Sequence, residues 1–278
     1  MQSIATRSAK GLAAFLLGLS FTALAPGATS LTPLVVAIRH GDCVTAVKLV
    51  NAQVSSNDDQ TPFVAGRMLD EGLCVKKDAA AATPYFARAV DLGNRSAKLD
   101  YAAKVGLGEG TEQSYEIAGD TCRSAGFDPQ AKLSHYSLGY ACTVLGVADK
   151  LLRETLPEGA FLPGSAALVE FTPVSAEMRI RSTPQVGRGD ANTGSLVRRP
   201  LVDAQQVIKK AWRDALAAVP KPDATRLDNQ TVELSLDVDM TLETDREVVT
   251  RSGIAATDGI LLQGDYRQAG GAAPAAGH

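Results

Sequence analysis

Apolar residues recur at three- and four-residue spacing in two neighbouring stretches of the N-terminal half, residues 63–71 and 78–92. This spacing places the apolar side chains on one face of an α-helix, so it predicts two amphipathic helices. Gly66 and Ala82 are small residues on these faces and allow the helix backbones to approach closely. Gly72 follows the first stretch, where a left-handed residue commonly ends a helix, so the pattern predicts a helical hairpin.

The hairpin pattern recurs with a period of 36 residues, and this shift pairs Gly72 with Gly108. A weaker third copy follows in residues 138–150, where Gly139 and Gly146 lie about two periods beyond the glycines of the first copy. Self-similarity at such a period is typical of stacked helical repeats, because each hairpin buries its apolar face against the next.

From about residue 160 the apolar spacing changes from helical to alternating, which marks a boundary. Two short strands are expected around a turn at residues 173–176, and a helix that Asp203 caps is expected to follow. Residues 232–243 then alternate apolar and polar side chains without a break, which predicts a third strand. The side chains expected to point inward are Val169, Phe171, Met178, Ile180, Ile208, Trp212, Ala215 and Val219.

The order strand, strand, helix, strand predicts a small antiparallel sheet with one covering helix. Trp212, the only tryptophan, lies on the apolar stripe of that helix and is the expected centre of the core. The predicted fold class is therefore α+β with two domains, an α-solenoid of helix-turn-helix repeats followed by this sheet.

The first 30 residues have the layout of a secretory signal: Arg7 and Lys10, an apolar run over 11–25, then small residues. We expect residues 1 to about 27 to be removed. The alternative is an uncleaved anchor, but such a run is shorter than the ~20 residues that a membrane-spanning helix needs. No integral membrane span is expected after signal removal.

Removing Arg7 and Lys10 from the 28 basic residues leaves 26 against 31 acidic residues, a net charge of −5. This balance offers no basic surface for nucleic acid or anionic membrane, so neither is expected as a partner. Cys43, Cys74, Cys122 and Cys142 form an even set in an exported chain, which predicts two disulfides. A zinc site is the alternative, but no C-x-x-C occurs and few histidines are near, so no metal is expected.

The glycine and alanine pattern resembles the SEL-one-like repeat family, relatives of the tetratricopeptide repeats. The residues that carry the resemblance are Gly66, Gly72, Val75, Asp78, Ala82, Ala89 and Gly93. The resemblance covers residues 33–152 and implies an α-solenoid that binds proteins or peptides. In such a stack Cys43 lies beside Cys74, and Cys122 is left to pair with Cys142.

The large aromatic side chains of the two best repeats, Tyr85, Phe86 and Tyr101, are the candidate partner-binding residues on a solenoid surface. The alternative is that they belong to the core. Gly66, Gly72, Gly108, Gly139, Gly146 and Trp212 are expected to be structural.

Residues 160–246 are similar to the C-terminal domain of the TonB/TolA family, on the stretches "ALVEF", "MRIRSTP" and "AWRDALAAVPKP" and the last strand. This resemblance implies a component of the cell envelope. The small and polar composition of residues 247–278 predicts a largely disordered tail.

We find no pattern that predicts catalysis or a cofactor. "GLGEG" at residues 106–110 lacks the Lys-Ser/Thr of a phosphate loop and reads as a repeat turn, and no G-x-S-x-G occurs. We therefore expect a periplasmic or secreted, non-enzymatic interaction or scaffold protein of the envelope with a protein or peptide partner. The alternatives are an envelope-transducing component that pairs an edge strand with its partner and, third, a cell-wall hydrolase.

Overall fold

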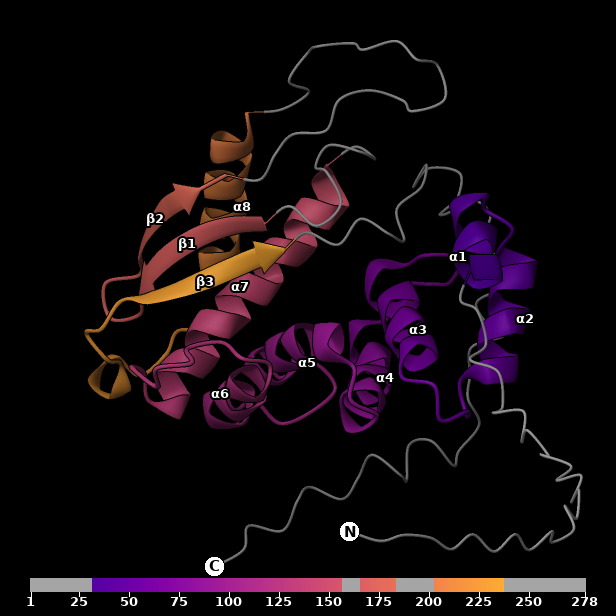
Figure 1. Ribbon diagram of the computed structural model, residues 1–278, viewed down its shortest axis with the longest axis horizontal. Helices are drawn as coiled ribbons and strands as arrows, with labels where there is room; N and C mark the ends of the chain where they lie inside the picture. The colour runs from indigo at the N-terminus through magenta and orange to yellow at the C-terminus, as the bar shows by residue number, and fades with distance from the viewer. Residues whose placement is uncertain (1–31, 157–165, 184–202, 238–278) are drawn as a thin grey trace, which may run out of the picture.

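The computed structural model describes residues 32–156, 166–183 and 203–237. This part of the chain is mostly helical and contains one small antiparallel sheet, so the fold is α+β (Figure 1). The predicted signal segment, the predicted tail and the last six residues of the predicted third strand lie outside the described residues. The elements are α1 (Thr32–Arg39), α2 (Cys43–Gln53), α3 (Gln60–Glu71), α4 (Ala79–Asp91), α5 (Arg95–Leu107), α6 (Tyr115–Ser124), α7 (His135–Thr155), β1 (Ala166–Thr172), β2 (Glu177–Ser182), α8 (Ala204–Ala218), a 3-10 turn (Ala224–Arg226) and β3 (Val232–Asp237).

The first six helices follow one another as packed pairs, α1 with α2, α3 with α4 and α5 with α6. The predicted hairpin boundaries are confirmed: α3 and α5 end at Gly72 and Gly108, whose φ angles are 76° and 73°. Only glycine adopts this left-handed conformation without strain. Asp78 begins α4 by accepting a hydrogen bond from the backbone N–H of Ala81.

The third copy of the repeat is not a hairpin. Gly139 and Gly146 both lie inside α7, which runs unbroken for 21 residues. A side chain at Gly139 would collide with the backbone of Tyr115, and one at Gly146 would press on Ala103. Both glycines therefore serve close packing of α7 on α6 and α5 rather than a turn, a distinction that the spacing alone does not make.

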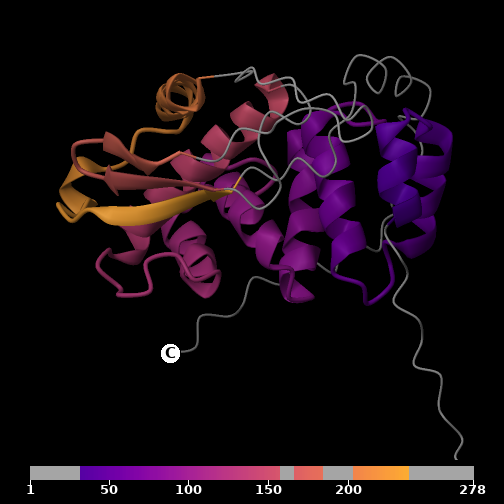
Figure 2. The ribbon, with the colours of Figure 1, turned by 45° about the horizontal axis from the view of Figure 1, so that its top comes forward.

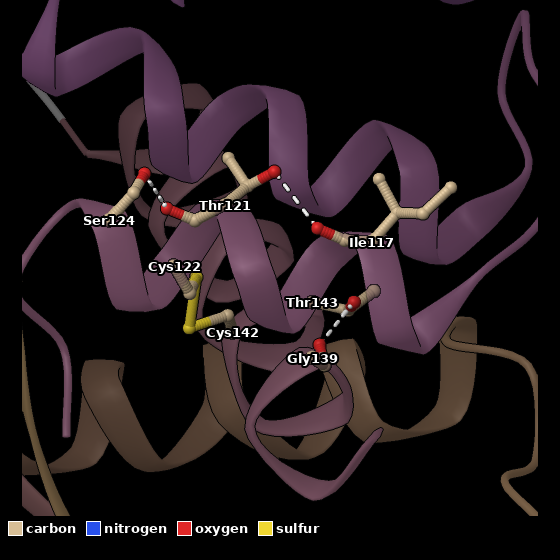
Figure 3. Close-up of a disulfide and its surroundings, with 7 residues drawn as sticks. All are labelled: Ile117, Thr121, Cys122, Ser124, Gly139, Cys142 and Thr143. Carbon is tan, nitrogen blue, oxygen red and sulfur yellow. Dashed lines mark hydrogen bonds between the residues drawn. A yellow bond between two sulfur atoms is a disulfide. The ribbon is translucent and has the colours of Figure 1, made fainter. Parts of the chain in front are cut away.

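Two disulfides join neighbouring helical elements. Cys43 pairs with Cys74 and Cys122 pairs with Cys142, at Cα separations of 4.8 Å and 6.5 Å. These are the pairs expected for stacked hairpins. Figure 3 shows the second bond between α6 and α7, beside the hydroxyl of Thr143, which donates to the Gly139 carbonyl at 2.7 Å.

The sheet has the strand order β2-β1-β3, and both pairings are antiparallel, as predicted. Val169 on β1 lies opposite Leu234 on β3 and opposite Ile180 on β2. The alternating side chains of β1 and β3 that point inward are fully buried, whereas those of β2 are only partly buried. One face of the sheet therefore forms a core and the strand β2 lies at its edge.

The helix α8 packs on α7 and on the buried face of the sheet. Asp203 caps it as predicted, and Ile208, Trp212 and Ala215 are buried along one stripe. The Trp212 ring meets Phe171 of β1 edge-on at 5.2 Å between centroids, and Phe171 in turn lies 6.0 Å from Tyr140 of α7. A chain of aromatic contacts thus connects α8, the sheet and α7.

The boundary near residue 160 does not divide the hydrophobic core. One cluster of buried apolar side chains contains residues of α5, α6, α7, α8 and all the inward positions of β1 and β3, while a second contains those of α1 to α4 with Ala97. The expected sheet domain therefore shares its core with the second half of the helical array. Figures 1 and 2 show the sheet and α8 at one end of the molecule and α1 and α2 at the other.

The segment between α8 and β3 is fastened to α6 and α7 by hydrogen bonds. The Tyr115 hydroxyl donates to the Pro220 carbonyl at 2.5 Å, and the Ser134 amide donates to the Asp228 carboxylate at 2.6 Å. Arg226 pairs with Glu116 and lies over the Tyr136 ring, 3.9 Å from its centroid. These contacts connect the two halves of the sequence at the molecular surface. The shared hydrophobic core connects the same two halves in the interior.

Candidate functional site

A cavity of about 490 Å³ opens between the helical array and the sheet. Its walls come from α3, α5, the loop that joins α6 to α7, α7 itself, and the side of β1 and β3 that does not face the core. The charged residues that line it are Arg67, Arg95, Asp100, Asp128, Asp149 and Glu233. Four carboxylates and two guanidinium groups therefore meet in one cavity.

Beneath the cavity lies a buried cluster of ion pairs centred on Arg153, whose side chain is 1% exposed. Its Nε donates to Glu71 at 2.9 Å and its Nη2 lies 3.3 Å from Asp100, while its Nη1 pairs with Asp149. Arg67 lies 3.6 Å from Asp100 on the cavity side. Residues of α3, α5 and α7 are thus joined by directional contacts that fix the floor of the cavity.

Asp149 differs from the other carboxylates of the cavity floor. Its Oδ2 pairs with Arg153, but its Oδ1 has no hydrogen-bond partner, although the residue is only 3% exposed. An unpartnered buried carboxylate oxygen costs about 1–3 kcal/mol or more, so most such atoms in proteins are hydrogen-bonded. Asp149 is one of the residues that line the cavity, so its unpaired oxygen is the candidate acceptor for a donor at this wall.

Deeper between α3, α5 and α7, Asp70 lies between Lys104 and Lys150. Burial acts to raise the pKa of Asp70, but the positive charges of Lys150 and Lys104 outweigh it and hold that pKa below its usual value. Burial likewise acts to lower the pKa of Lys150, and Asp70 outweighs it, so that pKa is raised. Asp70 and Lys150 therefore stay charged at neutral pH.

The loop after α6 forms a fixed wall of the cavity. Asp128 lies in the left-handed region, with φ 49°, and its carboxylate accepts the backbone N–H groups of Lys132 and Leu133, both at 2.9 Å. The Cys122–Cys142 bond holds the end of α6 from which this loop departs. Strained residues held by their surroundings are common at ligand clamps, which fits a wall of a binding site.

Two of the three aromatic residues predicted to bind a partner are core residues instead. Phe86 is completely buried against Phe63 and Gly66, and Tyr85 is 5% exposed. Tyr101 is partly buried and packs against both apolar clusters. A large apolar residue on a helix face suits a core as well as a groove, so the spacing alone does not tell the two apart, and none of the three lines the cavity.

The spacing of apolar positions does not reveal the charged residues beneath the cavity. A usable signal exists in the three helices that meet there. Each contains two opposite charges four residues apart, and these pairs are Arg67 and Glu71, Asp100 and Lys104, and Asp149 and Arg153. Such pairs usually lie on solvated faces, so only the packing shows that these are buried.

In the part of the chain that the structure describes, no group of His, Cys, Asp and Glu side chains is arranged to hold a metal ion. None of the described helices is both long and apolar enough to cross a membrane. Comparison of the chain with protein families, with curated proteins and with solved structures found no match.

Proposed function

We propose that the protein is an exported, non-enzymatic scaffold of the cell envelope that binds a protein or peptide partner at the cavity between its helical pairs and its sheet. The observation that carries the proposal is the composition of this cavity: its walls come from both halves of the chain, and charged side chains of both signs line them. Sites that bind ligands are commonly concave and contain a few fixed polar groups.

The state of the cavity's carboxylates favours recognition over catalysis. Asp100 is held between two guanidinium groups, and Asp128 accepts two backbone N–H groups. Groups fixed in this way keep one position, which suits the selection of a partner. The oxygens of a general acid or base need instead to be within hydrogen-bond reach of the substrate.

The two disulfides fit a non-cytoplasmic protein, because such bonds persist in oxidising compartments. Together with the signal-like first 27 residues, they support a periplasmic or secreted location. The repeated hairpins with left-handed glycines at Gly72 and Gly108 support the SEL-one-like resemblance, in which stacked helices bind proteins or peptides.

The test is affinity capture from the envelope fraction of the native host with the exported chain as bait, read by mass spectrometry. Leu168→Trp places a larger side chain in the cavity from the face of β1 that lines it, and Glu177→Gln on β2 is a control outside the cavity. We expect one or a few proteins to be retained by the wild type and the control and lost with Leu168→Trp. Retention that is equal with all three baits would refute a role for the cavity.

One edge of the sheet, formed by β2, favours a second candidate, the addition of a partner's strand. Among the described strands, β2 pairs only with β1, and four of its six residues are exposed. A partner could therefore extend the sheet through backbone hydrogen bonds, as the TonB/TolA resemblance implies. Arg181→Pro would block this edge without altering the cavity, so loss of capture with this variant alone would favour strand addition.

A further inference from the structure

We propose that the cavity receives a basic side chain, lysine or arginine, from a polypeptide partner. This inference rests on the proposed interaction function and specifies the chemistry of its site. It assigns the carboxylate of Asp149 as the main recognition group and Glu233 as a second carboxylate at the rim.

The charges of the cavity favour a cation. Of its charged lining residues, Asp100, Asp128, Asp149 and Glu233 are acidic, and only Arg67 and Arg95 are basic. The ion-pair partners directly behind the lining, Arg153, Arg123 and Glu71, bring the count to five acidic against four basic groups. The remaining excess of one negative charge attracts a positive group more strongly in a cavity than it would on an open surface.

Asp149 gives the cation a specific place to bind. Its Oδ1 is covered by protein and has no hydrogen-bond donor, while its Oδ2 is occupied by Arg153. One of the two oxygens of this carboxylate therefore lacks a donor, and Asp149 is a residue of the cavity wall. An ammonium or guanidinium group that enters the cavity and displaces the atoms covering Oδ1 supplies both the missing donor and a compensating charge.

The rim fits the rest of an extended peptide. Glu233 and Ser235 are exposed on alternate positions of β3, and Arg95 and Ser96 are exposed at the first turn of α5. Arg95 donates from its Nε to the Ala125 carbonyl at 3.1 Å, and both residues line the cavity. Such donors suit peptide carbonyl groups, whereas Glu233 faces a cation that enters the cavity.

An anionic side chain fits the cavity poorly. Arg67 lies 3.6 Å from Asp100 and is therefore already engaged with an acidic group. An anion that reached the floor would meet Asp149 and Asp100, and the guanidinium groups beside them, those of Arg67 and Arg153, are already paired with these carboxylates. Like charges in a buried site disfavour binding.

The probes are three blocked pentapeptides, each of four glycines around a central lysine, norleucine or glutamate. Binding to the exported chain is measured from the amide NMR shifts of Gly126, Leu168 and Ser235, which line the cavity. We expect saturable shifts with the lysine peptide. The norleucine peptide should bind at least about tenfold more weakly, because it lacks the charged hydrogen bond.

Three variants locate the site. Asp149→Asn should weaken binding of the lysine peptide about tenfold, and Glu233→Gln about threefold, as expected for a buried and an exposed charge. Leu168→Trp should abolish binding, and Glu177→Gln should leave it unchanged. Glu233 and Leu168 lie outside the buried ion pairs, so their variants remain informative if Asp149→Asn does not fold.

Equal affinity for the lysine and norleucine peptides, or tighter binding of the glutamate peptide, overturns the proposal. It also falls if Leu168→Trp and Glu233→Gln both bind the lysine peptide like the wild type. If an envelope protein is captured through the cavity but the lysine peptide does not bind, the interaction function stands and the basic side chain is wrong. If the peptide binds as expected and nothing is captured, the site stands and the proposed function falls.

Discussion

Replacing Trp212 with alanine should destabilise α5 to α8 and the sheet together. The indole ring is 2% exposed and packs edge-on against Phe171. Truncating a buried tryptophan to alanine costs about 3–5 kcal/mol. Its Nε1 has no hydrogen-bond partner, however, and an unsatisfied buried donor already costs about 1–3 kcal/mol in the wild type. We therefore expect a loss near the lower limit, about 3 kcal/mol.

Trp212→Phe is the matched comparison. It keeps an aromatic ring beside Phe171 and removes the unsatisfied N–H, so the loss of packing and the removal of the penalty oppose each other. We expect a change of less than about 1.5 kcal/mol, as for other swaps that largely preserve volume. Urea unfolding followed by far-UV circular dichroism measures both values without tryptophan fluorescence, which these variants lack.

Hydrogen exchange shows where the stability is lost. Because Trp212 shares a cluster with the buried residues of α5 to α7, protection should fall in these helices as well as in α8 and the sheet. Phe86→Ala, in the other cluster, should instead reduce protection first in α3 and α4. If Trp212→Ala exposes only the sheet and α8, the shared core is wrong and the boundary near residue 160 separates two folding units.

Three further outcomes are expected. Because the pKa of Asp70 is lowered, its contribution to the free energy of unfolding is complete above its unfolded pKa of about 4 and is lost as the pH falls through its folded pKa. In acid titrations followed by circular dichroism, Asp70→Asn should therefore flatten the loss of stability below about pH 4. The pKa of Lys150 is raised, so its contribution to the free energy of unfolding is complete below its unfolded pKa of about 10.4 and is lost as the pH rises through its folded pKa. Lys150→Met should therefore flatten the loss of stability on the alkaline side of the same titration. Replacing Cys122 and Cys142 with alanine should lower the free energy of unfolding by about 3 kcal/mol, measured in urea, because the bond closes a loop of 20 residues.

The local features of the fold could be predicted from the sequence because their causes are local. Gly72 and Gly108 end helices through their own backbone conformation, and Asp203 caps α8 with its own side chain. The alternation around Val169 depends only on the two-residue period of a strand. The pairing of the cysteines required one further step, the stacking of neighbouring hairpins.

The shared core and the cavity depend on contacts between residues far apart in the chain. Tyr140 meets Phe171, and Phe171 meets Trp212, only because α7 and α8 pack on one face of the sheet. The change of apolar spacing near residue 160 marks a change of secondary structure, but it does not divide the hydrophobic core. Phe86 was misplaced for a related reason, since helical spacing shows which face is apolar but not what covers it.

The ion pairs beneath the cavity explain how the two apolar clusters are joined. The cluster of α1 to α4 and that of α5 to α8 meet where Arg153 of α7 contacts Glu71 of α3 and Asp100 of α5. Apolar contacts are not directional, whereas a guanidinium group that bonds two carboxylates permits little sliding of the helices. Buried ion pairs often add little net stability, and in some proteins they fix one arrangement among several. Here the arrangement that they fix is the relative position of α3, α5 and α7, so the same contacts that align the helices also set the shape and charge of the cavity.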